Sequence, residues 1–214
     1  MFYVNLKYLK RKVFTVDKIS VIVPCFNEED VLPLFYQEVT KVLESIENTT
    51  YELLFINDGS SDHTEDLIKL MAHKNKQCFY YSFSRNFGKE AAMYAGLENA
   101  TGNYVVIMDA DLQHPPYLLK EMYHSLKEEN YDCCAGKRID RTGEGKLRNF
   151  LSHSFYKVIQ TLTKMDMDDG AGDFRMMTRQ MVDAILELKE YNRYMKGLFS
   201  FVGFNTKWLE FHNV

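Results

Sequence analysis

Acidic and amide side chains follow three of the predicted strands, each directly after an apolar run. The first cluster holds Asn27 and Glu28, the second begins at Asp58, and the third contains Asp109 and Asp111. If these strands are parallel, their carboxyl ends meet at one edge of the sheet, which is where open α/β sheets bind ligands. The sequence therefore predicts one polar site at that edge, suited to a cation and a hydrogen-bonding ligand.

Asp109 and Asp111 predict a site for Mg²⁺ or Mn²⁺. Residues two apart at a strand end point the same way, so both carboxylates can face one ion. These hard cations prefer oxygen ligands, and Mg²⁺ is commonly held by one or two carboxylates plus substrate phosphates. Solvated acids are also common in turns, but this pair follows the apolar run at residues 104–108. We therefore favour the cation site.

Asp58 closes the second predicted strand and is followed by Gly59. A carboxylate there can accept the imide N–H of uracil or the N–H groups of guanine. The alternative is a helix-capping turn, in which Asp62 caps the next helix with Glu65 three residues on. Both interpretations can hold together.

The elements that position these residues alternate between short β-rich runs and helical patterns. This alternation is typical of one α/β domain, with a Rossmann-like central sheet and helices on both faces. Beyond Arg138 we expect a polar loop, a long helix over 147–165, a loop over 166–173 and a helix near 178–188. The expected strands are residues 19–24, 51–57, 78–84, 104–108 and 131–135.

Composition excludes several classes of protein. The 214 residues suit one domain, and a net charge of −4 argues against a nucleic-acid partner. The four cysteines show no CxxC spacing, so we expect reduced, buried thiols in the cytoplasm. No apolar stretch reaches the roughly 20 residues that span a bilayer. Residues 1–18 form a basic N-terminal tail, which could touch an anionic membrane, although a loosely docked tail is the favoured interpretation.

Five motifs carry a family resemblance, and they lie at residues 21–29, 56–62, 84–89, 109–115 and 172–175. Together they resemble glycosyltransferase family 2, whose members have the GT-A fold of nucleotide-diphospho-sugar transferases. The resemblance is strongest to the polyprenyl-phosphate sugar synthases, a group containing dolichyl-phosphate mannose synthase and the bactoprenol (undecaprenyl-phosphate) glucosyltransferases. It implies a single GT-A domain over residues 19–214. Members of that group usually continue into transmembrane helices, and this sequence has none.

The resemblance implies roles for individual residues. Asp109 and Asp111 would hold the cation at the diphosphate, with Gln113 as a third ligand. Asp173 would be the catalytic carboxylate, in a loop apart from the nucleotide cluster. The residues expected to bind the nucleotide sugar are Pro24, Asn27, Glu28, Asp58, Gly59, Lys89 and Asp109.

The acceptor side is predicted from a cluster of bases. Arg138 and Arg148 flank a polar loop, and Arg175 follows Asp173, so these three could grip a phosphate. A solvated loop paired with its own acids is the equal alternative. The apolar stripe of the helix over 147–165 is more often core than membrane contact.

These features predict an inverting, metal-dependent transfer of a hexose from a UDP- or GDP-sugar to a polyprenyl phosphate. We expect the enzyme at the inner face of the membrane, held peripherally or by a membrane partner subunit. The alternatives are a hydroxyl-acceptor glycosyltransferase of surface polysaccharide synthesis and a truncated, non-catalytic nucleotide-binding subunit. A nucleotidyltransferase is disfavoured, because the loop after the first strand carries Glu28, Glu29 and Asp30 where that class has bases.

Overall fold

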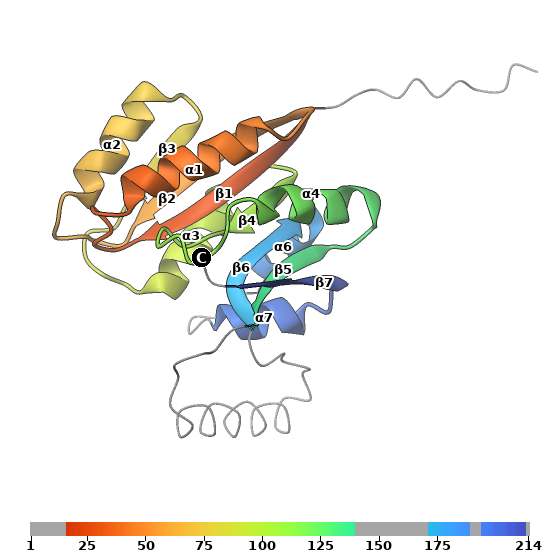
Figure 1. Ribbon diagram of the computed structural model, residues 1–214. Coiled ribbons are helices and arrows are strands. Elements are labelled where there is room, and N and C mark those ends of the chain that lie inside the picture. Colours follow the sequence, from red (N-terminus) through yellow and green to blue (C-terminus); the bar gives the residue numbers. More distant parts are fainter. Residues whose placement is uncertain (1–15, 140–170, 189–193, 213–214) are drawn as a thin grey trace, which may run out of the picture.

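The computed structural model describes residues 16–139, 171–188 and 194–212 (Figure 1). They form one seven-stranded sheet in the order β3-β2-β1-β4-β6-β5-β7. This architecture confirms the predicted α/β class with helices on both faces. The strands are β1 (Asp17–Cys25), β2 (Thr49–Asn57), β3 (Cys78–Ser82), β4 (Tyr104–Ile107), β5 (Cys133–Arg138), β6 (Ala171–Thr178) and β7 (Thr206–Phe211). The helices are α1 (Leu32–Glu44), α2 (Thr64–Lys74), α3 (Lys89–Asn99), α4 (Leu118–Glu128), α6 (Arg179–Leu186) and α7 (Met195–Phe201).

Strands β1 to β4 form the parallel half of the sheet. β1 pairs in parallel with both β2 and β4, and β2 pairs in parallel with β3. The register sets Cys25 opposite Asn57, and the Asp58 backbone N–H donates to the Cys25 carbonyl oxygen at 2.8 Å. The loops after β1, β2 and β4 therefore leave from one edge, as the sequence predicted.

The other half of the sheet differs from the prediction. Strand β6 lies antiparallel between β4 and β5, whereas the sequence suggested a loop up to residue 173. Strand β7 pairs in parallel with β5, and neither β7 nor α7 was predicted. The long helix expected over 147–165 lies outside the described residues. Asp173 thus belongs to a strand beside β4 rather than to a separate loop.

Two apolar layers cover the sheet. α1, α2 and α4 pack on one face, around Phe35, Ile68 and Leu119, and α3, α6 and α7 pack on the other (Figure 1). α3 lies very close to β1 because Gly96 faces Ile22, where an added Cβ would stand 2.2 Å from a side-chain methyl carbon. This close approach fixes the start of α3, which carries Lys89, against the strands that end at the polar edge.

All four cysteines are free and buried, as expected. The N-cap residue of α2 is His63, so Asp62 lies one residue before the N-cap position. The Asp62 carboxylate instead accepts from the backbone N–H groups of Thr64 and Glu29. The capping box with Glu65 is therefore wrong. β1 begins at Asp17, two residues before the predicted domain start.

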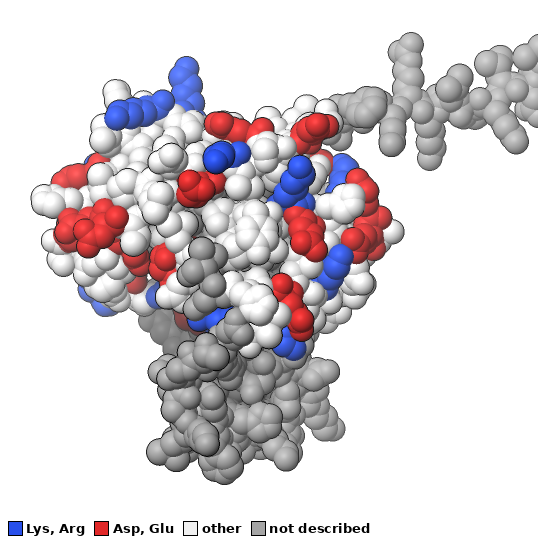
Figure 2. Space-filling model, viewed as in Figure 1, with Lys and Arg blue, Asp and Glu red and all other residues white. Residues whose placement is uncertain are grey.

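The described surface carries both signs of charge. On the face shown in Figure 2, acidic and basic side chains are interspersed. Within the part of the chain that the structure describes, no helix has the length and hydropathy needed to cross a bilayer.

Candidate active site

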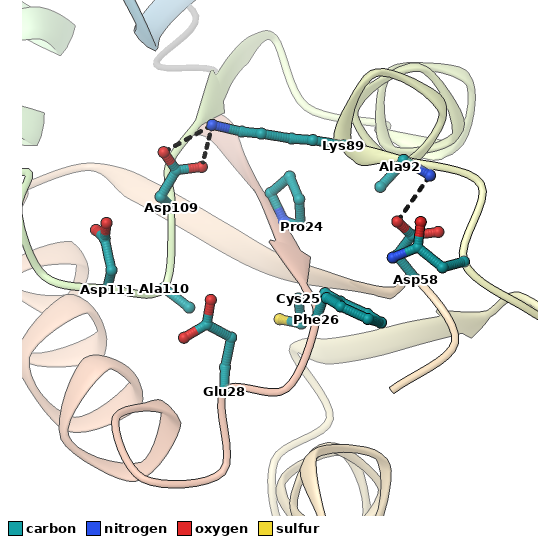
Figure 3. A pocket seen from close by; sticks show the side chains of 12 residues that line it. Pro24, Cys25, Phe26, Glu28, Asp58, Lys89, Ala92, Asp109, Ala110 and Asp111 are labelled. Carbon is teal, nitrogen blue, oxygen red and sulfur yellow. Dashed lines mark hydrogen bonds and ion pairs between the residues drawn. The ribbon is translucent and has the colours of Figure 1, made fainter. Parts of the chain in front are cut away.

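The loops after β1, β2 and β4 surround a cavity of about 320 Å³ at the carboxyl edge of the parallel strands (Figure 3). The start of α3 closes its remaining side. Five of the predicted donor-site residues line it, which are Pro24, Glu28, Asp58, Lys89 and Asp109, together with the predicted cation ligand Asp111. Residues more than eighty positions apart therefore meet in one place.

Asn27 does not line this cavity and instead joins two of its loops. Its backbone lies in the left-handed region (φ 56°), which Asn tolerates better than most residues. The Asn27 N–H donates to the Ser60 hydroxyl at 3.0 Å, and its side-chain oxygen accepts from the Ser61 N–H at 2.9 Å. The structure therefore gives Asn27 a positioning contact between the loops after β1 and β2.

Asp58 is held rigidly at the back of the cavity. Only 3% of the residue is exposed, and its two carboxylate oxygens accept from the backbone N–H groups of Phe87 and Gly88 at 2.7 and 2.9 Å. Each oxygen keeps a further lone pair that a bound base could use. Asp58 thus anchors the loop before α3 as well as facing the cavity, a role that sequence reasoning did not anticipate.

Gly59 allows the loop after β2 to lie against the backbone of Arg85 and Asn86. Its φ of 69° favours glycine, and an added Cβ would stand 2.4 Å from the backbone carbonyl carbon of Arg85. Any larger residue would push the Arg85 segment away from β2. Gly59 does not line the cavity.

We predict that Gly59→Ala lowers the free energy of unfolding well beyond the cost of its dihedral angle. Gly203 is a matched control, because its φ is 68° and a Cβ there would meet nothing within 4 Å. Gly203→Ala should cost about 1–2 kcal/mol from backbone strain alone. Gly59→Ala adds an overpacking cost of about 1–3 kcal/mol. Urea denaturation compares the two variants, and equal losses would contradict the close approach of residues 84–88.

Glu28, Asp109 and Asp111 concentrate negative charge on one side of the cavity (Figure 3). Burial raises the pKa of Glu28, and repulsion from Asp111 and Asp109 raises it further. Among the described residues, no group of three or more His, Cys, Asp or Glu side chains is arranged to hold a metal ion alone. Two carboxylates that leave room for substrate phosphates are, however, a donor set suited to Mg²⁺ or Mn²⁺. The residues present therefore fit such a cation.

Gln113 does not join this carboxylate pair. Its side-chain oxygen accepts from the Arg138 guanidinium at 2.7 Å, and it does not line the cavity. Leu112, just before it, lies in the left-handed region (φ 57°), a strained conformation for a bulky side chain that is typical of functional loops. The predicted third cation ligand is thus occupied elsewhere in this structure.

Lys89 links the cavity to Asp173. Its ammonium nitrogen lies 2.7 Å from Asp109 Oδ1 and 2.8 Å from Asp173 Oδ2 (Figure 3 shows the Asp109 contact). Burial opposes the charge on Lys89, but the two carboxylates outweigh it and raise the pKa of the ammonium. The expectation that Asp173 lies apart from the nucleotide cluster is therefore wrong. Strand β6 places Asp173 where it shares the ion-pair partner Lys89 with Asp109.

Asp173 is itself largely buried, with 14% of its side chain exposed. Burial acts to raise its pKa, but Lys89, with Lys196 and Arg175 behind it, outweighs burial and lowers the pKa below the ordinary value. Its second oxygen, Oδ1, is buried and has no hydrogen-bond partner within the described part of the chain. One oxygen of this carboxylate is thus fixed by Lys89, and the other is buried without a hydrogen-bond partner in the described chain.

The predicted acceptor bases lie in different surroundings. Arg175 is only 4% exposed, stacks on the Phe199 ring at 3.9 Å and donates to the Gly172 carbonyl oxygen at 2.9 Å. This position is inside the helical layer, so the structure contradicts Arg175 as a phosphate contact. Arg138 is half-buried beside Gln113, and Arg148 lies outside the described residues.

Two residues near the site were missed. His114 stacks on Phe174, with ring centroids 4.8 Å apart, and its Nδ1 lies 4.0 Å from Asp109 Oδ2. Burial lowers the pKa of the His114 ring, and the nearby carboxylates of Asp109 and Asp111 oppose this shift. Lys196 of α7 contributes to the lowered pKa of Asp173. His114 lies within the 109–115 motif, so the sequence could have identified it as a site residue. Lys196 could not be placed near the site from the sequence, because helix α7 was not predicted.

Comparison with known proteins agrees with this geometry. The family model described as "Glycosyl transferase family 2" matches residues 20–186. A Bacillus subtilis protein named as a glycosyltransferase, CsbB, is 46% identical over 92% of this chain and 59% of its own length. The bactoprenol glucosyl transferase of Shigella phage SfX is 39% identical over 91% of this chain and 63% of its own. The chain thus spans about three fifths of the length of these relatives.

A solved structure shares the fold. The mannosyltransferase PcManGT from Pyrobaculum calidifontis, in complex with GDP-Man and Mn²⁺, superposes with a TM-score of 0.63 at 16% identity, over 91% of this chain and 55% of that one. The likeness at this identity concerns the fold, which is the GT-A glycosyltransferase fold. With the family model covering most of the sequence, this chain belongs to glycosyl transferase family 2.

Proposed function

We propose that this chain carries the catalytic site of an inverting glycosyltransferase that moves a hexose from a UDP- or GDP-sugar to a polyprenyl phosphate. The observation that carries the proposal is the single lysine joining Asp109, in the donor cavity, to Asp173. A donor carboxylate and a second, buried carboxylate are thereby held side by side. The bactoprenol glucosyl transferase relatives support a polyprenyl lipid as the acceptor.

The donor side would use residues that already line the cavity. Asp58 would accept from the N–H groups of the base, while Asp109 and Asp111 would hold Mg²⁺ or Mn²⁺ together with the diphosphate. PcManGT, which has this fold, was solved with Mn²⁺ and a GDP-sugar, and this supports the assignment. When bound, such a cation neutralises the charge that develops on the leaving diphosphate.

The acceptor would attack from the side of Asp173. A phosphate oxygen forms the new bond to the anomeric carbon while the bond from that carbon to the nucleotide diphosphate breaks, and the diphosphate leaves with the electron pair. A phosphomonoester has a second pKa near 6, so a lipid phosphate is largely dianionic at neutral pH. Asp173, paired with Lys89, would orient this nucleophile rather than deprotonate it.

The membrane setting is part of the proposal. A polyprenyl phosphate requires that the site reach the lipid surface, which a peripheral contact at the cytoplasmic face or a membrane partner subunit would provide. Arg138, half-buried beside the site, is the described base we assign to the lipid phosphate, together with Arg148.

We predict that a sugar nucleotide raises the melting temperature only when Mn²⁺ or Mg²⁺ is present. At a ligand concentration 100 times its dissociation constant, the linked stabilisation is about 2.7 kcal/mol. For a domain of this size each kcal/mol corresponds to roughly 2–4 °C. Differential scanning fluorimetry with a panel of UDP- and GDP-sugars, with cation or with excess chelator, makes the measurement. Equal stabilisation in chelator would remove the cation from the donor site.

A further inference from the structure

Lys89 occupies a position between the donor side and the acceptor side of the site. It is the first residue of α3 and follows Gly88, whose backbone N–H donates to Asp58 at 2.9 Å. The Asp58 carboxylate thus fixes the backbone position from which the Lys89 side chain extends. From there the side chain reaches over Pro24 to Asp109 (Figure 3).

The contacts of Lys89 occupy both oxygens of the Asp109 carboxylate. The ammonium nitrogen lies 2.7 Å from Oδ1 and 2.8 Å from Oδ2. Asp109 is also one of the two carboxylates suited to a divalent cation. A cation that binds Asp109 must therefore compete with Lys89 for the same oxygens, since two positive charges close to one carboxylate repel each other.

The same ammonium group holds the acceptor-side carboxylate. Asp173 Oδ2 lies 2.8 Å from Lys89, whereas Oδ1 is buried and without a partner in the described chain. An ionised Asp173 would repel an anionic acceptor unless a cation stood beside it. Lys89 supplies that charge and fixes one of the two oxygens in place.

We propose that Lys89 is a positioning residue shared by the two halves of the site. Without a donor it is divided between Asp109 and Asp173. When cation and donor occupy Asp109, it is committed to Asp173, so the acceptor carboxylate is fully neutralised only after the donor has bound. This inference rests on the proposed function.

Two substitutions test the proposal. Lys89→Met keeps the unbranched chain up to the position of Cε and removes the charged ammonium group, whereas Lys89→Arg keeps the charge. Lys69, an exposed lysine that pairs with Glu65 on α2, provides a matched control as Lys69→Met. For each variant we would measure Mn²⁺ affinity by isothermal titration calorimetry without donor, and then kcat and the acceptor KM.

We expect Lys89→Met to bind Mn²⁺ more tightly, by roughly 3–30-fold, because the competing charge is gone and partial exposure weakens its effect. Its kcat should nevertheless fall about 10²-fold, since Asp173 loses its fixed position. Lys89→Arg should recover part of kcat, and Lys69→Met should match the wild type. Tighter cation binding combined with slower turnover is not the result of a merely structural role.

Two outcomes would overturn the inference. Unchanged or weaker Mn²⁺ binding by Lys89→Met would exclude competition at Asp109, and an unchanged kcat would exclude the positioning of Asp173. The calorimetric titration uses Mn²⁺ alone. It therefore tests whether Lys89 and the cation compete for Asp109 even if the wild type transfers no sugar to polyprenyl phosphate. That last result would count against the proposed function and not against the shared lysine.

Discussion

Asp109→Asn is expected to lower kcat by about 10²–10³-fold, the loss typical when one electrostatic contact to developing charge is removed. The amide keeps the shape of the side chain but removes the negative charge that a cation and Lys89 both need. Initial rates at saturating donor and Mn²⁺ measure the effect. Asp66→Asn, on the exposed face of α2, is the matched control and should retain full activity.

Asp111→Asn distinguishes the two roles proposed for Asp109, which are cation binding and the ion pair with Lys89. Asp111 lines the cavity, and its Oδ1 accepts from the Gln113 N–H, whereas Lys89 contacts Asp109 and Asp173. A cation held by both carboxylates predicts a large loss in each variant. If Asp109→Asn were impaired while Asp111→Asn turned over normally, the ion pair with Lys89 would be the cause and the cation site would be wrong.

Asp173→Asn is the second substitution with a large expected effect, and its pH profile distinguishes the acceptors. The pKa of Asp173 lies below its ordinary value, so the carboxylate stays ionised as pH falls through 6. For a lipid phosphate the variant should lose about 10²-fold through misorientation. It should keep the acidic limb near pH 6 that belongs to the acceptor's own second ionisation.

A hydroxyl acceptor would give a different result. Attack by a hydroxyl requires a base, so removing Asp173 should cost about 10²–10⁴-fold, with the steepest loss at low pH. Because Lys89 joins Asp173 to Asp109, we also expect the donor KM to change in this variant. Rates from pH 5 to 9 for the wild type and the variant make the comparison. Full activity of Asp173→Asn on a verified acceptor would exclude Asp173 from the mechanism.

The parallel half of the fold was predictable because its signals are local. β1, β2 and β4 are near-continuous apolar runs, as strands covered on both faces require. α1 and α4 show apolar residues at helical spacing, and these side chains are buried in the structure. Parallel strands end at one edge, so the meeting of Asp58, Asp109 and Asp111 followed from the order of the elements.

The antiparallel half was not predictable in the same way. β6 carries Gly172, Asp173 and Arg175, residues typical of a solvated turn, and it is a strand because it pairs with β4 and β5. Side chains alternate along a strand, so Phe174 and Met176 enter one core while Arg175 is carried into the other layer. The link from Lys89 to Asp173 depends on this long-range pairing, which no local pattern reveals.

The most direct test of the proposed activity is mass spectrometry of the lipid products. The chain is incubated with Mn²⁺, detergent-solubilised polyprenyl phosphate and a panel of UDP- and GDP-sugars. We predict a new species, polyprenyl phosphate carrying one hexose, that disappears with excess chelator and with Asp109→Asn. If the wild type formed no such lipid while transferring the same hexose to a hydroxyl acceptor, the proposal of a polyprenyl-phosphate acceptor would be wrong.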